Sequence, residues 1–375
     1  MQEKKNALIV VNSFNIGGTV SSLYTLLSMV DTQKVHIDIF ARNISGFYID
    51  KLPNCTLLPE NLWLSYTIYK KNFLVRMAKT FLFFIRKVLE IVGVDMFLIY
   101  NHIGGKQLHT ENYDAVIGFD ESLSRYISAL PARKRINWIH CDYRRYVNGK
   151  DESCYYDKID TVVCVSEFAK GIFCEYYPKY ANKTVAIHNI INVEDLHHKA
   201  SKPIDDERFY NDCFTIVSCG RMDPVKQFHL IPFIVDRIRK NTDKPFHWYI
   251  IGGGNEEVEK HIEQEIEQYK VSNYVKLLGM KTNPYNYMAK SNLYVCTSWS
   301  ESYPMVVNEA KALGLPVVCN IFPSASESVH DGVNGFILDI ENMPDVIASM
   351  IEKPLEIENY QSENDKILEF FYSLL

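Results

Sequence analysis

Short apolar runs alternate with longer amphipathic stretches along nearly the whole chain, and this alternation restricts the fold more than any other feature. Runs of four or five residues suit buried strands, and the stretches between them are long enough for helices. Strands separated by helices form parallel sheets, so we expect an α/β fold. The predicted strands lie at residues 7–11, 37–41, 115–119, 136–140, 162–165, 185–188, 215–219, 247–251, 275–278, 293–297, 316–319 and 335–338.

The chain is long enough for two domains. It has 375 residues, of which 47% are hydrophobic and 23% charged, as is typical of a globular protein. A polar stretch without apolar runs separates the two sets of predicted strands. We therefore predict a first domain at 1–192, a linker at 193–212, a second domain at 213–355 and a terminal helix within 356–375.

Charge and cysteine usage exclude several classes of protein. The net charge of −6 and the pI near 6.0 argue against a general nucleic-acid binder. The nine cysteines are scattered without a Cys-x2-Cys pair, which favours buried free thiols. We expect no signal peptide, because the first residues lead directly into a predicted strand, and no segment is apolar enough to span a bilayer. These features predict a cytoplasmic protein.

Two glutamates lie where a parallel sheet would bind a ligand. Glu301 and Glu309 are eight positions apart, between the predicted strands at 293–297 and 316–319. Pro304 suits the first turn of a helix, so Glu301 is expected in the preceding loop and Glu309 about one and a half turns into that helix. Loops at the carboxyl ends of such strands bind ligands, and free N–H groups at a helix start attract anions.

This segment resembles a known donor site. Glu301-x7-Glu309-Ala-x-Ala-x-Gly-x-Pro-Val-Val is similar to the donor-site signature of retaining glycosyltransferases of family 4. That family has the GT-B fold, two facing Rossmann-like domains with a C-terminal helix that crosses back to the N-terminal domain. Further landmarks of the family follow in the expected order, at Gly17-Gly18, 162–170, 187–192, 220–226, 250–254, 275–279 and 331–335.

The resemblance implies a role for individual residues. Arg221 and Lys226 would bind the donor diphosphate, Glu309 the ribose hydroxyls and Glu301 the donor sugar. His140 would touch the sugar near the reacting carbon, and Arg144 and Arg145 are candidates for the acceptor. The predicted catalytic set is Glu301, His140, Arg221 and Lys226. The predicted donor-binding set is Gly17, Gly18, Arg221, Lys226, Met280, Glu301, Ser302, Tyr303, Pro304, Met305 and Glu309.

Each of these residue types also has an ordinary structural explanation. Arg221, Lys226 and Glu309 can be solvated charges at or near helices, and Gly17-Gly18 can be a plain strand-to-helix turn. A lone histidine such as His140 is often structural. Many relatives have a glutamate where this chain has Val20, so we assign no acceptor activation there. The chain has no Asp-x-Asp motif, and we expect neither a metal nor a cofactor, only the nucleotide-sugar co-substrate.

Segment 66–92 has an unusual composition. As one helix it would form an apolar stripe on one face and a basic cluster of Arg76, Lys79, Arg86 and Lys87 on the other, with Phe83 among the basic side chains. Either the stripe packs on the sheet and the basic face is solvated, or the basic face binds an anionic membrane surface. The predicted stripe consists of Phe73, Met77, Phe81, Phe84, Val88 and Val92.

The resemblance implies a hexosyltransferase that retains the anomeric configuration. The donor would be a nucleotide diphosphate sugar, with a UDP-sugar favoured, and the acceptor a lipid-linked saccharide in bacterial capsule, exopolysaccharide or lipopolysaccharide synthesis. Such a protein would be cytoplasmic or peripheral on the inner face of the cytoplasmic membrane. Two alternatives are a sugar-nucleotide epimerase of the same fold and a noncatalytic sugar-binding partner subunit.

Overall fold

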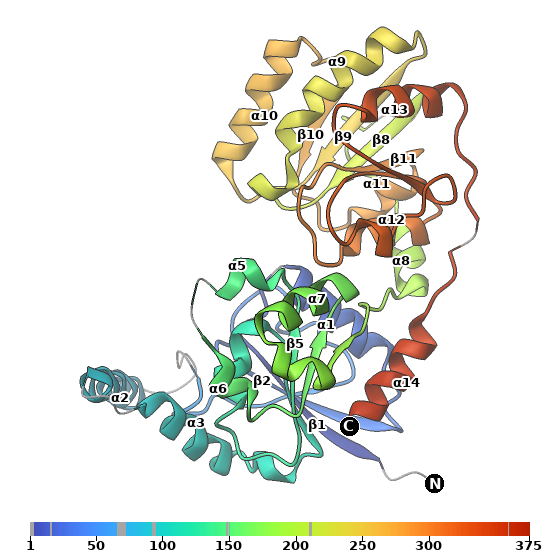
Figure 1. The fold of residues 1–375 in the computed structure, drawn as a ribbon. Coiled ribbons are helices and arrows are strands. Elements are labelled where there is room, and N and C mark those ends of the chain that lie inside the picture. The colour runs from blue at the N-terminus through green and yellow to red at the C-terminus, as the bar shows by residue number, and fades with distance from the viewer. Residues whose placement is uncertain are drawn as a thin grey trace. The chain divides into compact units, whose positions relative to one another are not determined.

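The computed structural model describes residues 4–15, 17–65, 73–91, 95–147, 149, 151–209, 212–358 and 360–375. The chain divides into two compact units, one formed by Met1–Ile190 with Glu363–Leu375 and the other by Ile191–Ser362 (Figure 1). Part of segment 66–92, namely 66–72 and residue 92, lies outside the described residues, as do residues 210 and 211 of the predicted linker.

The first unit is a parallel sheet in the order β3-β2-β1-β4-β5-β6-β7. Its strands are β1 (Lys5–Val11), β2 (Val35–Ala41), β3 (Thr56–Leu57), β4 (Ala115–Gly118), β5 (Arg135–Ile139), β6 (Thr161–Cys164) and β7 (Thr184–Ala186). Its helices are α1 (Gly18–Met29), α2 (Phe73–Ile91), α3 (Met96–Gln107), α4 (Ser124–Ile127), α5 (Tyr143–Val147), α6 (Ser153–Tyr156), α7 (Glu167–Tyr176) and α14 (Asn364–Leu374), with 3-10 turns η1 (Thr110–Asn112), η2 (Glu121–Leu123) and η3 (Pro178–Lys183).

The second unit is a parallel sheet in the order β10-β9-β8-β11-β12-β13. Its strands are β8 (Phe214–Cys219), β9 (Phe246–Ile251), β10 (Val275–Gly279), β11 (Leu293–Cys296), β12 (Val317–Asn320) and β13 (Gly335–Leu338). Its helices are α8 (Val193–Ala200), α9 (Ile231–Asn241), α10 (Glu256–Tyr269), α11 (Tyr285–Ala289), α12 (Met305–Ala312) and α13 (Met343–Glu352), with 3-10 turns η4 (Pro224–Lys226), η5 (Phe228–Leu230) and η6 (Ala325–Glu327).

The strands are mainly apolar, as expected where helices cover both faces of a sheet. In β8, Ile216 packs into a core with residues of α9, α10 and α13, whereas its neighbour Val217 packs into a second core with residues of α11 and α12. Successive side chains of a strand point to opposite faces, so each strand of the second unit contributes side chains to both cores. The fold class predicted from the sequence, two Rossmann-like parallel sheets, is confirmed.

The terminal helix α14 returns to the first unit, as predicted. The hydroxyl of Tyr372 accepts a hydrogen bond from the backbone N–H of Asp31 at 2.7 Å, and the buried ring of Phe371 lies 6.4 Å from that of Trp138. The helix begins at Asn364, eight residues after the start of the predicted segment.

The predicted linker at 193–212 differs from the structure, because its first part is helix α8. The side chain of Asn192 caps this helix by accepting a hydrogen bond from the N–H of Asp195 at 3.0 Å. Leu196 then packs with Ile191 and Ala312. These apolar contacts group α8 with the second unit.

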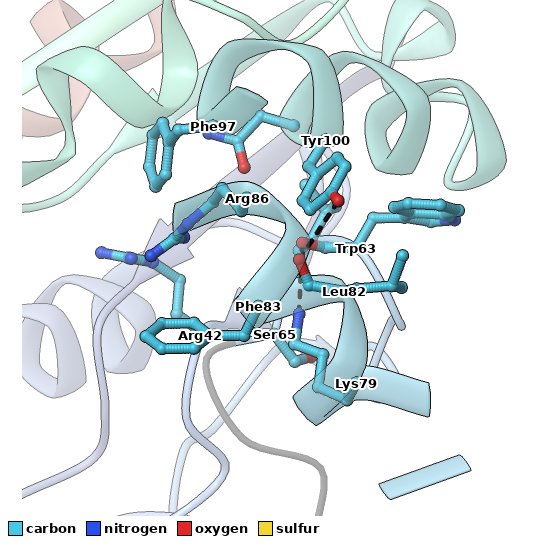
Figure 2. Close-up of a pocket in the computed structure, with 11 residues that line it drawn as sticks. Arg42, Trp63, Ser65, Lys79, Leu82, Phe83, Arg86, Phe97 and Tyr100 are labelled. Carbon is cyan, nitrogen blue, oxygen red and sulfur yellow. Dashed lines mark hydrogen bonds between the residues drawn. The ribbon is translucent and has the colours of Figure 1, made fainter. Parts of the chain in front are cut away.

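Helix α2 contradicts both packings considered for segment 66–92. Its apolar side chains are exposed, with 72% of Phe73, 63% of Phe81 and 65% of Phe84 accessible. The face that turns inward instead carries Lys79 and Arg86, which line a cavity against α3 and the loop at 61–65 (Figure 2). Lys79 donates hydrogen bonds to backbone carbonyls there. The predicted basic cluster is therefore divided, with Lys79 and Arg86 on the inner face of α2 and Arg76 and Lys87 exposed. Figure 1 shows α2 at the margin of the first unit, next to α3.

Among the described residues, no helix is both long enough and apolar enough to cross a bilayer. All nine cysteines are free.

Candidate active site

The strand order of the second sheet reverses between β8 and β11, and the loops that follow these two strands carry a partly buried ion pair. Lys226 ends η4 after β8, and Glu301 lies in the loop after β11. Lys226 Nζ is 2.6 Å from Glu301 Oε1, and their side chains are only 17% and 16% exposed. Burial by itself would lower the pKa of Lys226, but the adjacent Glu301 carboxylate holds that pKa above its usual value. Ligands of doubly wound sheets bind at such a crossover.

Neighbouring hydrogen bonds fix both loops. Thr297 Oγ1 donates to the carbonyl of Lys226 at 2.6 Å, and Ser324 Oγ donates to the carbonyl of Glu301 at 2.7 Å. The backbone N–H of Trp299 donates to the carbonyl of Val225 at 3.2 Å. The two charged side chains are therefore held in place by their backbones as well as by each other.

Arg221 lies in the same loop as Lys226 but is exposed. Its guanidinium is 3.7 Å from the Asp223 carboxylate, and 70% of the side chain is accessible. The positive charge of Arg221 opposes protonation of Lys226, which places the two cations near each other. An exposed guanidinium beside a partly buried ammonium suits a ligand with several anionic oxygens.

Glu309 is buried on α12. Only 7% of the residue is exposed, and Tyr285 donates its hydroxyl proton to Glu309 Oε1 at 3.0 Å. Burial raises the pKa of Glu309 to about 7, against the opposing effect of the Tyr285 hydrogen bond and the Lys199 charge. Glu309 is thus not the solvated helical glutamate that the sequence allowed as an alternative.

The other predicted donor residues of this unit lie at the same edge of the sheet. Pro304 caps α12 and Met305 is its first residue, so Ser302 and Tyr303 belong to the loop between Glu301 and the helix. Met280 is exposed and follows Gly279, the last residue of β10. The loops after β8 and β9 approach so closely that a Cβ at Gly252 would overlap the carbonyl of Gly220.

In the first unit, His140 follows β5. Its backbone N–H donates to Glu121 at 3.2 Å, and its ring lies 4.7 Å from the ring of Phe119. Burial lowers the pKa of His140 to about 3, so the imidazole is neutral. Its buried Nε2 has no hydrogen-bond partner in the described part of the chain. His140 can therefore offer a neutral hydrogen-bonding group, but not a positive charge.

Gly17 is the N-cap residue of α1, and Gly18 is the first residue of that helix. A Cβ at either position would meet no atom within 4 Å, so packing against the described residues does not require glycine there. Nothing in the structure distinguishes a plain turn from a loop that leaves room for a phosphate, and the donor role of these glycines stays a prediction.

Arg144 and Arg145 lie on α5. Arg144 donates hydrogen bonds to the Asp142 carboxylate through Nη2 at 2.7 Å and Nε at 3.0 Å, so it already has a local ion partner. Arg145 is exposed. Their proposed contact with an acceptor stays a prediction.

Sequence reasoning missed a polar cluster near His140. Asn12, just after β1, donates through Nδ2 to Asp120 Oδ1 at 3.2 Å and to Ser122 Oγ at 2.8 Å. Burial, together with the charge of Asp120, raises the pKa of Glu121. The signal available was the Asp120-Glu121 pair directly after the predicted strand at 115–119.

One group among the described residues has the composition of a metal site, although we predicted no metal. Ligand atoms of Asp212, Cys213 and His247 all lie within 4.8 Å of one another. These residues flank the amino ends of β8 and β9, whereas Lys226 and Glu301 follow the carboxyl ends of β8 and β11. An ion held by this group would lie at the opposite edge of the sheet from the ion pair.

Part of the chain is similar to a known family. Residues 199–367 match the family model of the glycosyl transferases group 1. This match covers most of the second unit. The chain is 26% identical over 166 residues to an uncharacterized glycosyltransferase of Methanocaldococcus jannaschii, a match that covers 44% of the chain and 40% of the relative. The chain thus spans less than half of that relative's length.

Two further proteins match over most of the chain. The N-acetylgalactosamine-N,N'-diacetylbacillosaminyl-diphospho-undecaprenol 4-alpha-N-acetylgalactosaminyltransferase of Campylobacter jejuni is 23% identical over 339 residues, 89% of this chain and 86% of the relative. The crystal structure of Anabaena HepE with UDP and glucose superposes with a TM-score of 0.69 and 17% identity, over 92% of this chain and 90% of that one. At this identity the superposition establishes the GT-B fold alone.

Proposed function

We propose that the protein is a retaining glycosyltransferase of the family 4 type, which moves a hexose from a nucleotide diphosphate sugar to a saccharide acceptor. The observation that carries the proposal is the partly buried Lys226–Glu301 pair at the crossover between β8 and β11, in a region that matches the group 1 family. A UDP-sugar is the favoured donor, because the HepE structure of the same fold contains UDP and glucose.

Donor binding is proposed to exchange the partner of Lys226. Without donor, the Glu301 carboxylate balances the Lys226 charge at 2.6 Å. A donor diphosphate brings two negative charges to this loop, and Lys226 can turn to them while the exposed Arg221 binds a second phosphate oxygen. Glu301 is then free to accept hydrogen bonds from sugar hydroxyls. The phosphates neutralised in this way are also the leaving group of the transfer, so the same contacts stabilise charge that develops during reaction.

Glu309 is proposed to accept hydrogen bonds from the ribose hydroxyls. In the ionised form both carboxylate oxygens can accept from a diol, and Tyr285 supports that form by donating to Oε1. With a pKa near 7, Glu309 changes its charge in the physiological range, and donor binding should favour the ionised state.

The acceptor is proposed to be a lipid-linked saccharide in bacterial surface polysaccharide synthesis. Two observations support this step. The Campylobacter jejuni relative is named for a diphospho-undecaprenol-linked acceptor. In addition, α2 exposes an apolar stripe with the cations Arg76 and Lys87 exposed beside it. The stripe consists of Phe73, Leu74, Met77, Phe81, Phe84, Val88 and Ile91.

Such a helix suits an anionic membrane surface, although with a different face than the sequence predicted. An in-plane helix buries its apolar side in the lipid and keeps flanking cations at the headgroups. We therefore propose that the protein is cytoplasmic and associates with the inner face of the membrane through the apolar stripe of α2.

The proposal is tested by incubating the protein with a panel of nucleotide sugars, with and without saccharide acceptors. We expect release of nucleoside diphosphate from one donor, a slow background hydrolysis without acceptor, and a product that keeps the anomeric configuration of the donor. An epimerised sugar nucleotide would instead identify an epimerase. Binding of the nucleotide sugar without any turnover would identify a noncatalytic sugar-binding subunit.

A further inference from the structure

Three side chains of different chemistry meet at the amino ends of β8 and β9. They are the Asp212 carboxylate, the Cys213 thiol and the His247 imidazole, and one ligand atom of each lies within 4.8 Å of the other two. In the part of the chain that the structure describes, this is the one such group of histidine, cysteine and acidic side chains. Asp212 is exposed and the other two are half-buried, so an ion can enter from solvent.

The register of the sheet brings Cys213 and His247 together. Thr215 of β8 is the register partner of His247 of β9, the adjacent parallel strand. Alternate residues of a strand point to the same face, and Cys213 lies two positions before Thr215. Val217 and Tyr249, the next residues on this face, pack into one core. Cys213 and His247 therefore lie at the amino edge of the face that this core covers.

Hydrogen bonds fix the backbone that carries Cys213. Thr215 Oγ1 donates to the carbonyl of Cys213 at 3.1 Å. The N–H of Thr215 donates to Asn292 Oδ1 at 2.8 Å, and the N–H of Asn292 donates to the carbonyl of Thr215 at 2.8 Å. The His247 ring in turn lies 6.0 Å from the ring of Tyr249. A binding site needs supported ligands of this kind, and here two of the three are held by strand backbones.

The ligand types select the kind of ion. A thiolate, an imidazole and a carboxylate are all ligands of Zn²⁺, whereas Mg²⁺ and Ca²⁺ take oxygen ligands and do not favour sulfur. The charges also balance. Cys213 as the thiolate and Asp212 as the carboxylate carry two negative charges, and the neutral His247 adds none, so a divalent cation makes the group neutral.

We propose that Asp212, Cys213 and His247 bind a zinc ion, with a water molecule as the fourth ligand of a tetrahedral site. Cys213 binds as the thiolate and releases its proton to solvent, and His247 binds as the neutral imidazole. The ion joins the start of β8 to the start of β9. The three residues lie outside the predicted donor and acceptor sets, so this is a separate site.

The position of the zinc site indicates a structural role. Ligands of doubly wound sheets bind at the carboxyl ends of the strands, where Lys226 and Glu301 lie, whereas this group lies at the amino ends. The ion links the point where the chain enters the second sheet to the neighbouring strand. Removing it should lower the stability of the second unit and leave turnover unchanged while the protein stays folded. The zinc site does not depend on the proposed function.

The zinc site is tested by titrating the full chain with Co²⁺ after dialysis against a chelator. Co²⁺ accepts the ligands of a zinc site, and a cobalt–thiolate bond gives a charge-transfer band in the near ultraviolet. The unmodified protein should show this band, and Zn²⁺ should remove it by displacing Co²⁺. Cys213→Ser should abolish the band. Cys154→Ser is the matched control, because Cys154 is exposed on α6 of the first unit and its loss should change neither the band nor the Co²⁺ affinity.

Two further variants test the other ligands and guard against a misfolded Cys213→Ser protein. Asp212→Asn and His247→Gln should each weaken Co²⁺ binding by more than about tenfold, since even the outer partners of a metal ligand contribute about tenfold to a hundredfold. The thiolate band should remain at saturating Co²⁺. Thermal unfolding without metal identifies the variants that are folded. Zn²⁺ should raise the unfolding temperature of the unmodified and Cys154→Ser proteins but not that of the folded Cys213→Ser protein.

The zinc site is overturned if the unmodified protein shows no thiolate band with Co²⁺. It is also overturned if the band persists in the Cys213→Ser protein, because another cysteine then binds the ion. Unchanged Co²⁺ affinity in folded Asp212→Asn and His247→Gln proteins would show a single reactive thiol instead of a three-ligand site. If the chain transfers no sugar but binds Co²⁺ through all three residues, the proposed function fails and the zinc site stands.

Discussion

In both sheets the strand order reverses after the first strand, between β1 and β4 in the first unit and between β8 and β11 in the second. The side chains in the loops at these two crossovers nevertheless differ. The second unit places a partly buried ion pair, Lys226–Glu301, after its crossover strands. The loops of the first unit hold Asn12 against Asp120, with the neutral His140 one strand further along the sheet. The strand order thus fixes where a ligand can bind, and the loops decide what it is.

The difference suggests a division of labour between the units. A pair of opposite charges suits a ligand that brings its own negative charge, such as a diphosphate, because Lys226 can exchange Glu301 for the phosphates. Neutral and carboxylate groups suit the hydroxyls of a saccharide. We therefore expect changes in the second unit to act on donor binding and changes in the first to act on the acceptor or the membrane.

The largest effect should come from Lys226→Gln. This change removes the proposed diphosphate contact and leaves Glu301 buried without its cation, so kcat/KM for the donor should fall about a hundredfold to a thousandfold. Steady-state kinetics with the preferred nucleotide sugar measures it. Arg239→Gln is the control, because it breaks a comparable pair with Asp236 at 2.6 Å on α9 and should lower stability without lowering turnover. Equal kinetics for the two variants would contradict the donor site.

Membrane binding should depend mainly on the apolar stripe. Changing Phe81 and Phe84 to Ser removes two exposed rings and should weaken binding to anionic vesicles about tenfold to a hundredfold. Changing Arg76 and Lys87 to Gln should have a smaller effect, about fivefold per charge, and one that disappears at high salt. Vesicle flotation measures both. If the Ser variant bound as well as the unmodified protein, α2 would not be the membrane contact.

A smaller effect is expected from pH. The folded pKa of Glu309, about 7, lies above its ordinary value of 4.5, so the neutral form is favoured at low pH. Donor affinity should therefore rise severalfold as pH increases from 6 to 8 and Glu309 ionises. The contribution of Glu309 to folding stability is fully present below pH 4.5 and is lost as pH rises through 7. Titration with an intact nucleotide sugar measures the affinity, and Glu309→Gln should remove the dependence. A pH dependence that persists in that variant belongs to another group.

No effect on turnover is expected from metal chelation. Lys226 and Arg221 are proposed to balance the diphosphate, so dialysis against EDTA should leave turnover unchanged. A loss that magnesium or manganese restores would contradict this balance of charges. A second cause of such a loss would be a metal held by Asp212, Cys213 and His247, which would affect stability from the other edge of the sheet. Cys213→Ser removes one ligand of that group and so distinguishes the two causes.

The fold was predictable because its signal is repeated along the chain. Twelve predicted strands correspond to strands of the two sheets, and most of them are apolar runs that are largely buried. Strand β3 was missed because it is only two residues long, Thr56–Leu57. Helix α8 was mistaken for linker because most of its residues are polar and its apolar packing rests on few side chains, chiefly Leu196 and Val193.

The orientation of α2 was not predictable from its amphipathic pattern. A hydrophobic stripe shows that a helix has two faces, but not which one meets the protein. Lys79 and Arg86 turn inward because backbone carbonyls and the Phe97 ring lie there, and these partners come from distant segments. The ion pair of Lys226 with Glu301 was likewise not predictable from the sequence, since the two residues are 75 positions apart.

The most direct test of the account compares nucleoside diphosphate affinity with turnover in Glu301→Gln and Glu309→Gln. If Lys226 exchanges Glu301 for the diphosphate, Glu301→Gln removes a competitor, so calorimetry should show nucleoside diphosphate binding that is unchanged or tighter. Saturated turnover should nevertheless fall about tenfold to a hundredfold, because a charged contact to the sugar is lost. Glu309→Gln should mainly weaken binding. Full turnover by Glu301→Gln, or loss of nucleoside diphosphate binding in Glu301→Gln but not in Glu309→Gln, would contradict the account.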